Sequence, residues 1–174
     1  MKLFLTFFLS FFIHSIIYSQ KNVVKIVPTN LIGNTLTIQY ERVLTDKKSL
    51  LISLNYMSKE NFYNAFSYQL QGFGIETAMK YTIGKKKMPE GWYFSPMIGS
   101  GRLYASSYRI EEMGTYLHVG NSVGHQWQIG GKNSKFSFDV NGRVGLVYFK
   151  NDKNDYIYCS GLVRRLAISI GYAF

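Results

Sequence analysis

The chain has 174 residues, enough for one domain with a closed core but too few for two, so we expect a single domain. Its composition combines 17% aromatic residues and 16 glycines with only 3 prolines, which favours strands and tight turns over helices. One cysteine excludes an internal disulfide. The formal net charge of +10 suits an anionic lipid surface, and no basic run with an exposed binding motif indicates nucleic acid as a partner.

A short apolar run opens the chain. After Lys2, the run LFLTFFLSFFI is followed by HSIIYSQ, which places the small residue Ser19 where a signal peptidase could cut. A bilayer-spanning helix needs roughly 20 apolar residues, so we predict that residues 1–19 are a secretion signal cut near Ser19 or Gln20. A lipoprotein anchor would need a cysteine at the cut, and Cys159 lies far downstream in a predicted polar loop.

Alternating apolar and polar residues recur along the rest of the chain. They predict eight strands, near residues 23–30, 34–43, 49–58, 69–83, 91–105, 114–129, 134–149 and 161–174. The links between strands alternate in length, with compact links at 44–48, 84–91 and 130–134 and longer links at 58–68, 106–114 and 150–160. This alternation is typical of an up-and-down barrel with short turns at one end. The predicted fold class is all-β, an eight-stranded antiparallel barrel that occupies residues 20–174 as one domain.

The two faces of the predicted strands differ in kind. In the segment 136–148, Phe138 shares a face with large apolar residues, whereas Asp139 shares the other face with small and charged ones. The segments 34–43 and 69–83 divide in the same way. A soluble lipocalin-like barrel would turn its apolar face inward around an apolar ligand, but sparse charges of both signs among small residues suit a crowded interior. We therefore predict a transmembrane barrel and keep the soluble barrel as the alternative.

Aromatic residues gather near both ends of the predicted strands, as in the girdles of membrane barrels. They are Trp92, Trp127, Tyr172 and Phe174 near the compact links, and Tyr56, Tyr104, Tyr116 and Tyr148 toward the longer links. The segment 166–174 alternates large and small residues without a charge, and it resembles the closing strand that the assembly machinery of outer-membrane barrels recognises. These features predict the outer membrane of a Gram-negative bacterium as the location, with membrane lipid, lipopolysaccharide and the barrel-assembly machinery as partners.

The hairpin pattern resembles the small OmpA-type and OmpX-type outer-membrane barrels, and more closely an uncharacterised family of secreted barrel domains. The matching pieces span nearly the whole predicted barrel and are Pro28 and Asn30, Tyr40-Glu41-Arg42, Glu76 with Lys80-Tyr81, GWYFSP at 91–96, GHQW at 124–127 and GYAF at 171–174. The resemblance implies the barrel fold. It implies no activity, because that family carries no established catalytic residues.

The number of strands limits the function. Eight strands leave an interior just wide enough for side chains, whereas porins with a water channel use about 16–18 strands, so no metabolite pore is expected. Three acids and three bases are predicted to face inward and to form a buried ion network that plugs the lumen: Glu41, Glu76, Asp139, Lys80, Arg143 and Arg165. The alternative is that several of them lie near the rims, where ion pairs in water contribute little.

Residues suited to catalysis or metal binding are sparse. His118 and Ser122 share a face but lie about 13 Å apart along a strand, and His125 falls on the other face. The facing of this strand stays open, because either choice turns Asn121 or Ser122 toward lipid. GFG and GSG lie inside strands, where glycine relieves crowding, and the histidines and the cysteine show no metal-ligand spacing. The sequence therefore predicts no enzyme, no cofactor and no metal site.

What remains is a structural or binding role. The longer links at 58–68 and 150–160 place tyrosines beside Asn and Asp, a composition suited to adhesive contact. We expect an envelope-structural role, with binding of an unknown extracellular ligand through the longer links as a second or additional role. The alternatives are a soluble lipocalin-like carrier of an apolar ligand and, less favoured, a barrel enzyme that modifies lipid A.

Overall fold

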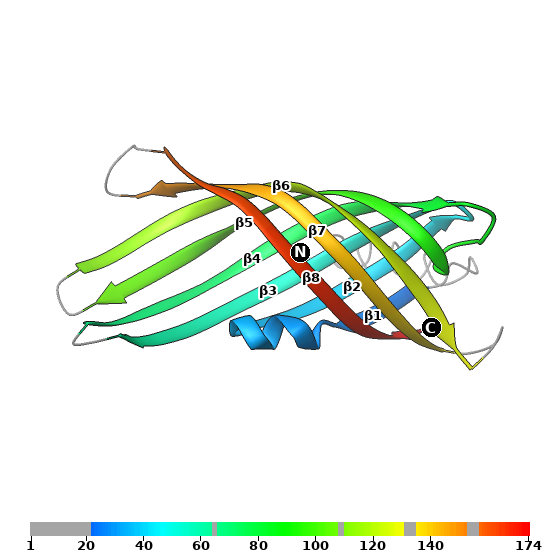
Figure 1. The fold of residues 1–174 in the computed structure, drawn as a ribbon, viewed down its shortest axis with the longest axis horizontal. Coiled ribbons are helices and arrows are strands. Elements are labelled where there is room, and N and C mark those ends of the chain that lie inside the picture. Colours follow the sequence, from blue (N-terminus) through cyan, green and yellow to red (C-terminus); the bar gives the residue numbers. More distant parts are fainter. Residues whose placement is uncertain (1–21, 64–65, 108–109, 131–134, 153–156) are drawn as a thin grey trace, which may run out of the picture.

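A computed structural model describes residues 22–63, 66–107, 110–130, 135–152 and 157–174. These residues form eight strands, each antiparallel to the next, and β8 pairs with β1 to close a barrel (Figure 1). The strands are β1 (Asn22–Ile26), β2 (Thr35–Thr45), β3 (Lys48–Tyr63), β4 (Phe66–Ile83), β5 (Gly91–Ser107), β6 (Ile110–Ile129), β7 (Phe136–Asn151) and β8 (Ile157–Ala173). The predicted eight-stranded up-and-down barrel is confirmed, and the predicted secretion signal lies outside the described residues.

The strands are tilted relative to the barrel axis, because the register of their pairing is staggered around the barrel. Residues that lie opposite each other on paired strands can be followed once around the barrel, from Val163 on β8 back to Ala173 on the same strand. The path runs through Gly145, Gly120, Met97, Ala78, Leu51, Glu41 and Val23. The register therefore shifts by ten residues, from 163 to 173. Such a stagger tilts the strands and sets the width of a barrel.

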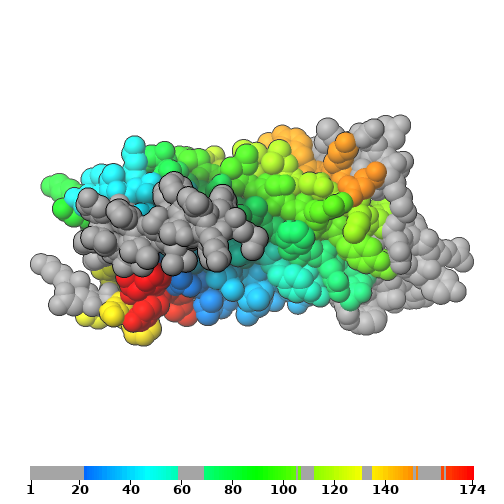
Figure 2. Space-filling model, turned by 180° about the vertical axis from the view of Figure 1, so that it is seen from behind, coloured from blue at the N-terminus to red at the C-terminus, as the bar shows by residue number. Residues whose placement is uncertain are grey.

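The compact links and both described ends of the chain lie at one end of the barrel, here called the turn end (Figure 1). Figure 2 shows β1 in blue beside β8 in red at this end of the elongated molecule. The opposite end, here called the far end, carries the β3–β4, β5–β6 and β7–β8 hairpins. Successive connections thus lie at alternate ends of the barrel, but the predicted alternation in length is not observed, because the β4–β5 link between Ile83 and Gly91 is longer than the β3–β4 link between Tyr63 and Phe66.

The first strand is shorter than predicted. The prediction placed a strand at residues 23–30, but β1 ends at Ile26 and a 3-10 helix, η1 (Pro28–Gly33), follows. Proline favours the first helical position, because its fixed φ suits a helix and its missing N–H leaves no donor unsatisfied there. Asn34 then adopts a left-handed conformation with φ 55° and leads the chain into β2.

Helix η1 takes the place of strand between β8 and β2. The Ile168 N–H of β8 donates to Thr29 Oγ1 at 3.0 Å, as it would to a strand neighbour. On the other side, Asn30 Nδ2 donates to Thr37 Oγ1 of β2 at 2.7 Å. These contacts fix η1 in the barrel wall.

The prediction of longer links was wrong. The segments at 58–68, 106–114 and 150–160 are mostly strand, because β3 extends to Tyr63 and β4 begins at Phe66, and the other two hairpins are built in the same way. Cys159 accordingly belongs to β8, opposite Tyr148, and not to a polar loop. These segments contain runs of polar residues, such as Lys59, Glu60 and Asn61, which interrupt the alternation that predicted the other strands.

Polar residues line the inside of the barrel and large apolar residues cover its outside. The largest fully buried side chains include Lys25, Lys80 and Glu41, which all face inward. In contrast, Phe73 and Leu166 on the outer face are 67% and 65% exposed. This distribution reverses that of a soluble protein, in which buried charges are rare and apolar side chains fill the core.

Candidate functional site

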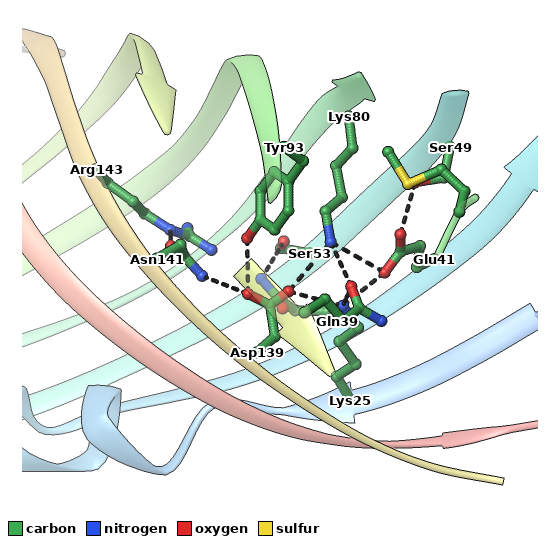
Figure 3. A network of polar contacts seen from close by, with 12 residues as sticks. Lys25, Gln39, Glu41, Ser49, Ser53, Lys80, Tyr93, Asp139, Asn141 and Arg143 are labelled. Atoms are coloured by element: carbon green, nitrogen blue, oxygen red, sulfur yellow. Dashed lines mark hydrogen bonds and ion pairs between the residues drawn. The ribbon is translucent and has the colours of Figure 1, made fainter. Parts of the chain in front are cut away.

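Four ions meet at the centre of the lumen and form what we call the central ion cluster: Lys25 of β1, Glu41 of β2, Lys80 of β4 and Asp139 of β7 (Figure 3). Lys25 Nζ lies 2.5 Å from Glu41 Oε2 and 3.0 Å from Asp139 Oδ2. Lys80 Nζ lies 3.3 Å and 3.1 Å from the same two oxygens. Each ammonium thus contacts both carboxylates, and the two positive and two negative charges cancel.

Neutral polar groups complete the hydrogen bonding of this cluster. Gln126 Oε1 accepts from Lys25 Nζ at 2.9 Å and from Lys80 Nζ at 2.6 Å. Tyr93 donates its hydroxyl to Asp139 Oδ1 at 2.7 Å, and the Lys80 ammonium lies 3.8 Å from the centre of the Tyr93 ring. Buried ions are tolerated only when such partners replace their water, so the lumen is filled at this level.

The turn between β4 and β5 covers the cluster at the turn end. Met88 in this turn is buried, and its sulfur lies 3.7 Å from Ser49 Oγ. Ser49 in turn donates to Glu41 Oε1 at 2.6 Å. An apolar side chain therefore lies between the central ion cluster and the water beyond the turns.

A second group, here called the Glu76 cluster, lies farther toward the far end and comprises Glu76 of β4, His118 of β6 and Arg143 of β7. Glu76 Oε1 lies 3.0 Å from Arg143 Nη1, and Glu76 Oε2 lies 3.3 Å from His118 Nδ1. Arg143 also donates to Asn141 Oδ1 at 2.8 Å. Asn141 Nδ2 in turn lies 3.4 Å from Asp139 Oδ1 and links the two clusters (Figure 3).

The structure places all six residues of the predicted network on the inner face, and five of them fall into two groups. Glu41, Lys80 and Asp139 belong to the central ion cluster, and Glu76 and Arg143 belong to the Glu76 cluster. Arg165 lies opposite Arg143 across the β7–β8 pair. No carboxylate among the described residues is within salt-bridge distance of its guanidinium, and its electrostatic neighbours are Arg143 and Glu76.

The predicted network lacked two members of these clusters, Lys25 and His118, and two hydrogen-bond partners of the central ion cluster, Tyr93 and Gln126. A signal for Lys25 is present in NVVKI, since Val24 and Ile26 alternate with it and lie on the exposed outer face. Tyr93 and Gln126 gave no comparable signal. Their roles depend on which strands face them across the lumen.

Glycines on the inner wall make room for two rings of β6. A Cβ added at Gly74 would lie 1.8 Å from the Tyr116 hydroxyl oxygen, and one added at Gly145 would lie 2.4 Å from His118 Nε2. Tyr116 therefore points into the lumen, and its assignment to the outer aromatic girdle was wrong. The facing of β6 is settled by the same alternation, because Ser122 is buried inside and Asn121 is exposed outside.

The other predicted girdle residues lie on the outer face. Trp92, Trp127, Tyr172, Phe174, Tyr56 and Tyr148 are exposed, and Tyr104 is half-buried. His125 packs between the two tryptophans, with ring centroids 5.1 Å from Trp92 and 4.2 Å from Trp127. His125 thus belongs to an aromatic band and lies on the opposite face from His118 and Ser122.

Nothing in the described part of the chain assembles a metal site, since no group of three or more His, Cys, Asp or Glu side chains could hold an ion there. No helix among the described residues is long and apolar enough to cross a membrane. No protein-family model, curated protein or solved structure matches the chain significantly.

Proposed function

We propose that the chain is a non-enzymatic outer-membrane β-barrel of a Gram-negative bacterium, with a structural role in the envelope. The observation that carries this proposal is the apolar outer face around a charged, side-chain-filled interior. Residues on all eight strands, from Val24 on β1 to Tyr172 on β8, expose large apolar side chains. In water such a surface would drive aggregation, whereas in a bilayer it is the face that lipid solvates.

The spacing of the outer aromatic residues supports a membrane band. On β7, Phe136 and Tyr148 are both exposed on the outer face and lie 12 residues apart. This separation is about 40 Å along the strand and about 30 Å along the axis at a tilt of about 40°. The height is close to the thickness of a bilayer hydrocarbon core, ~30 Å.

The strands are also longer than a bilayer requires. Strands β3 to β8 have 16 to 20 residues, whereas about 9–11 tilted residues span a membrane. The excess extends the hairpins of the far end beyond the aromatic band. We propose that these hairpins lie outside the cell and supply a surface for an extracellular ligand, in place of the long loops expected from the sequence.

Fractionation of a Gram-negative host that expresses the full chain tests the membrane proposal. We expect the protein in the outer-membrane fraction, with an electrophoretic band that shifts on boiling in detergent because a closed barrel resists unfolding until heated. A soluble periplasmic protein would contradict the proposal. In that case a carrier of an apolar ligand would have to bind its ligand on the outer face.

A further inference from the structure

The barrel wall is incomplete toward the far end. Strand β2 begins at Thr35, opposite Met57, so the β3 residues Lys59–Tyr63 pair only with β4. Strand β8 pairs with β1 only at Ile170–Ala173, and η1 bonds to it at Ile168. Among the described residues no pairing joins β8 to β3 beyond η1, and the far ends of these strands lie apart (Figure 1). We call this opening the wall break.

A cavity of about 380 Å³ lies in the lumen beside the wall break. Thr35 and Met57 line it from one side of the break, and Arg165 of β8 lines it from the other. Its volume falls within the range of about 300–1,000 Å³ that is typical of small-molecule sites. The cavity is therefore large enough for a ligand, although the lumen below it is filled.

The two ends of the cavity differ in chemistry. Glu76, His118, Arg143 and Arg165 line one end, where the Glu76 cluster separates the cavity from the filled lumen. Leu103 lines the other end, together with Met57 and the Tyr116 ring. Leu103 lies opposite Gly72, which is four residues from Glu76 on β4 in the direction of the β3–β4 hairpin. The apolar end is therefore the end nearer to the far end of the barrel.

The polar end carries one positive charge in excess. Glu76 neutralises Arg143 at 3.0 Å, and the Arg165 guanidinium has no carboxylate of the described chain within salt-bridge distance. Arg165 is half-buried, and its terminal nitrogen would lie 3.5 Å from a Cβ at Gly33 of η1. A partly buried guanidinium with planar donors is suited to bind one carboxylate in two-point geometry.

We propose that this cavity binds a small amphiphile with a single carboxylate, held by Arg165 and Arg143 at its acidic end and by Met57, Leu103 and Tyr116 along its apolar part. A monoanion matches the single excess charge. The ligand reaches the cavity from the far end or sideways through the wall break. Only the sideways route from lipid rests on the proposed membrane location, because the cavity itself depends on the fold alone.

Binding of decanoate to the folded barrel in an uncharged detergent tests the proposal. Carboxyl-labelled ¹³C decanoate is titrated and its bound resonance is separated from that of micellar decanoate. We expect saturable binding, and the alcohol decanol should bind at least about tenfold more weakly because it lacks the charged hydrogen bonds. Inorganic phosphate and acetate should not displace decanoate at equal concentration, since they lack an apolar part.

The variant Arg165→Gln should raise the dissociation constant of decanoate by about tenfold. Arg164→Gln is the matched control, because Arg164 is the next residue of β8 and is exposed on the outer face. It should leave binding unchanged. The boiling-dependent band shift of each variant checks that it is folded, and the comparison of decanoate with decanol on the unmodified chain needs no variant.

Absence of saturable decanoate binding would overturn the inference, and so would three further outcomes. They are equal binding of decanoate and decanol, equal loss in the two arginine variants, and displacement of decanoate by inorganic phosphate, which would indicate a site for small anions only. None of them bears on the proposed location, which fractionation measures separately. If the barrel is found in the outer membrane but does not bind decanoate, the proposed function stands and the proposed ligand is contradicted.

Discussion

Lys25, Glu41, Lys80 and Asp139 show why charge balance matters more than any single ion pair in this lumen. The side chains of all four are at most 3% exposed. Each ion replaces its lost hydration with two opposite charges and a neutral hydrogen-bond partner. Removing one of the four charges therefore destabilises the whole cluster, because the three remaining ions are buried with an uncompensated net charge.

The variant Glu41→Gln leaves two ammoniums facing one carboxylate. We expect it to lower the free energy of unfolding by about 3–5 kcal/mol, the usual cost of an uncompensated buried charge. Denaturant titration of the barrel folded in lipid vesicles measures this change. The double variant Glu41→Gln with Lys80→Met restores neutrality and should recover much of the loss.

Glu90→Gln is the control for this prediction. Glu90 pairs with Lys86 in the exposed β4–β5 turn, where an ion pair contributes about 0–1 kcal/mol. A Glu41→Gln variant as stable as Glu90→Gln would mean that water reaches the central ion cluster. Failure of Lys80→Met to rescue it would mean that the hydrogen bonds, and not the charge balance, stabilise this region.

Helix η1 occupies the place of a strand segment between β8 and β2. Its side chains make the hydrogen bonds to these strands that backbone groups make elsewhere in the wall. We expect Thr29→Val to lower the free energy of unfolding by about 1–3 kcal/mol, because the Ile168 N–H loses its acceptor. Hydrogen exchange should become faster at the Ile168 amide. Thr115→Val makes the same nearly isosteric replacement at an exposed threonine, and it should change neither the free energy of unfolding nor the exchange at Ile168. Unchanged exchange at Ile168 would show that η1 does not close the wall.

Most of the strands could be predicted because apolar and polar residues alternate within each segment, and this pattern needs no knowledge of the neighbouring strands. Helix η1 could not be predicted in this way. Pro28 and Asn34 set its two ends through their backbone φ angles, and the alternation of apolar and polar residues carries no information on φ. The hairpins of the far end were mistaken for loops because runs of polar residues, such as Lys59, Glu60 and Asn61, interrupt the alternation there. The inward facing of Glu41, Lys80 and Asp139 follows from local alternation, but their meeting point does not. Lys80 and Asp139 are 59 residues apart, and only the ten-residue stagger of the closed barrel brings them together.

The molecule as a whole has an apolar band whose height can be measured by substitution. Ile98 lies midway between Trp92 and Tyr104 on β5, whereas Ile83 lies at the turn end of β4. Both are about half exposed, at 53% and 54%, so a soluble barrel would tolerate arginine equally at either. In a bilayer, Ile98→Arg should cost about 2–4 kcal/mol and Ile83→Arg about 0–1 kcal/mol. Equal costs in vesicles would contradict the membrane band.

The two ends of the barrel should meet different compartments. An epitope inserted between Tyr63 and Phe66, the paired ends of β3 and β4, is expected at the cell surface because the far-end hairpins extend beyond the aromatic band. Antibody should therefore label intact cells. An epitope inserted at Lys85, in the turn between β4 and β5, should be labelled only after the outer membrane is permeabilised.

The reverse pattern of labelling would place the turn end outside and remove the far-end hairpins as a ligand surface. It would also turn the apolar end of the cavity toward the periplasm, so that an amphiphile entering from the far end would come from the periplasm. Orientation thus decides the source only for a ligand that enters from the far end, and not for one that enters sideways through the wall break. The central ion cluster lies between this cavity and the turn end in either orientation, because its position belongs to the fold.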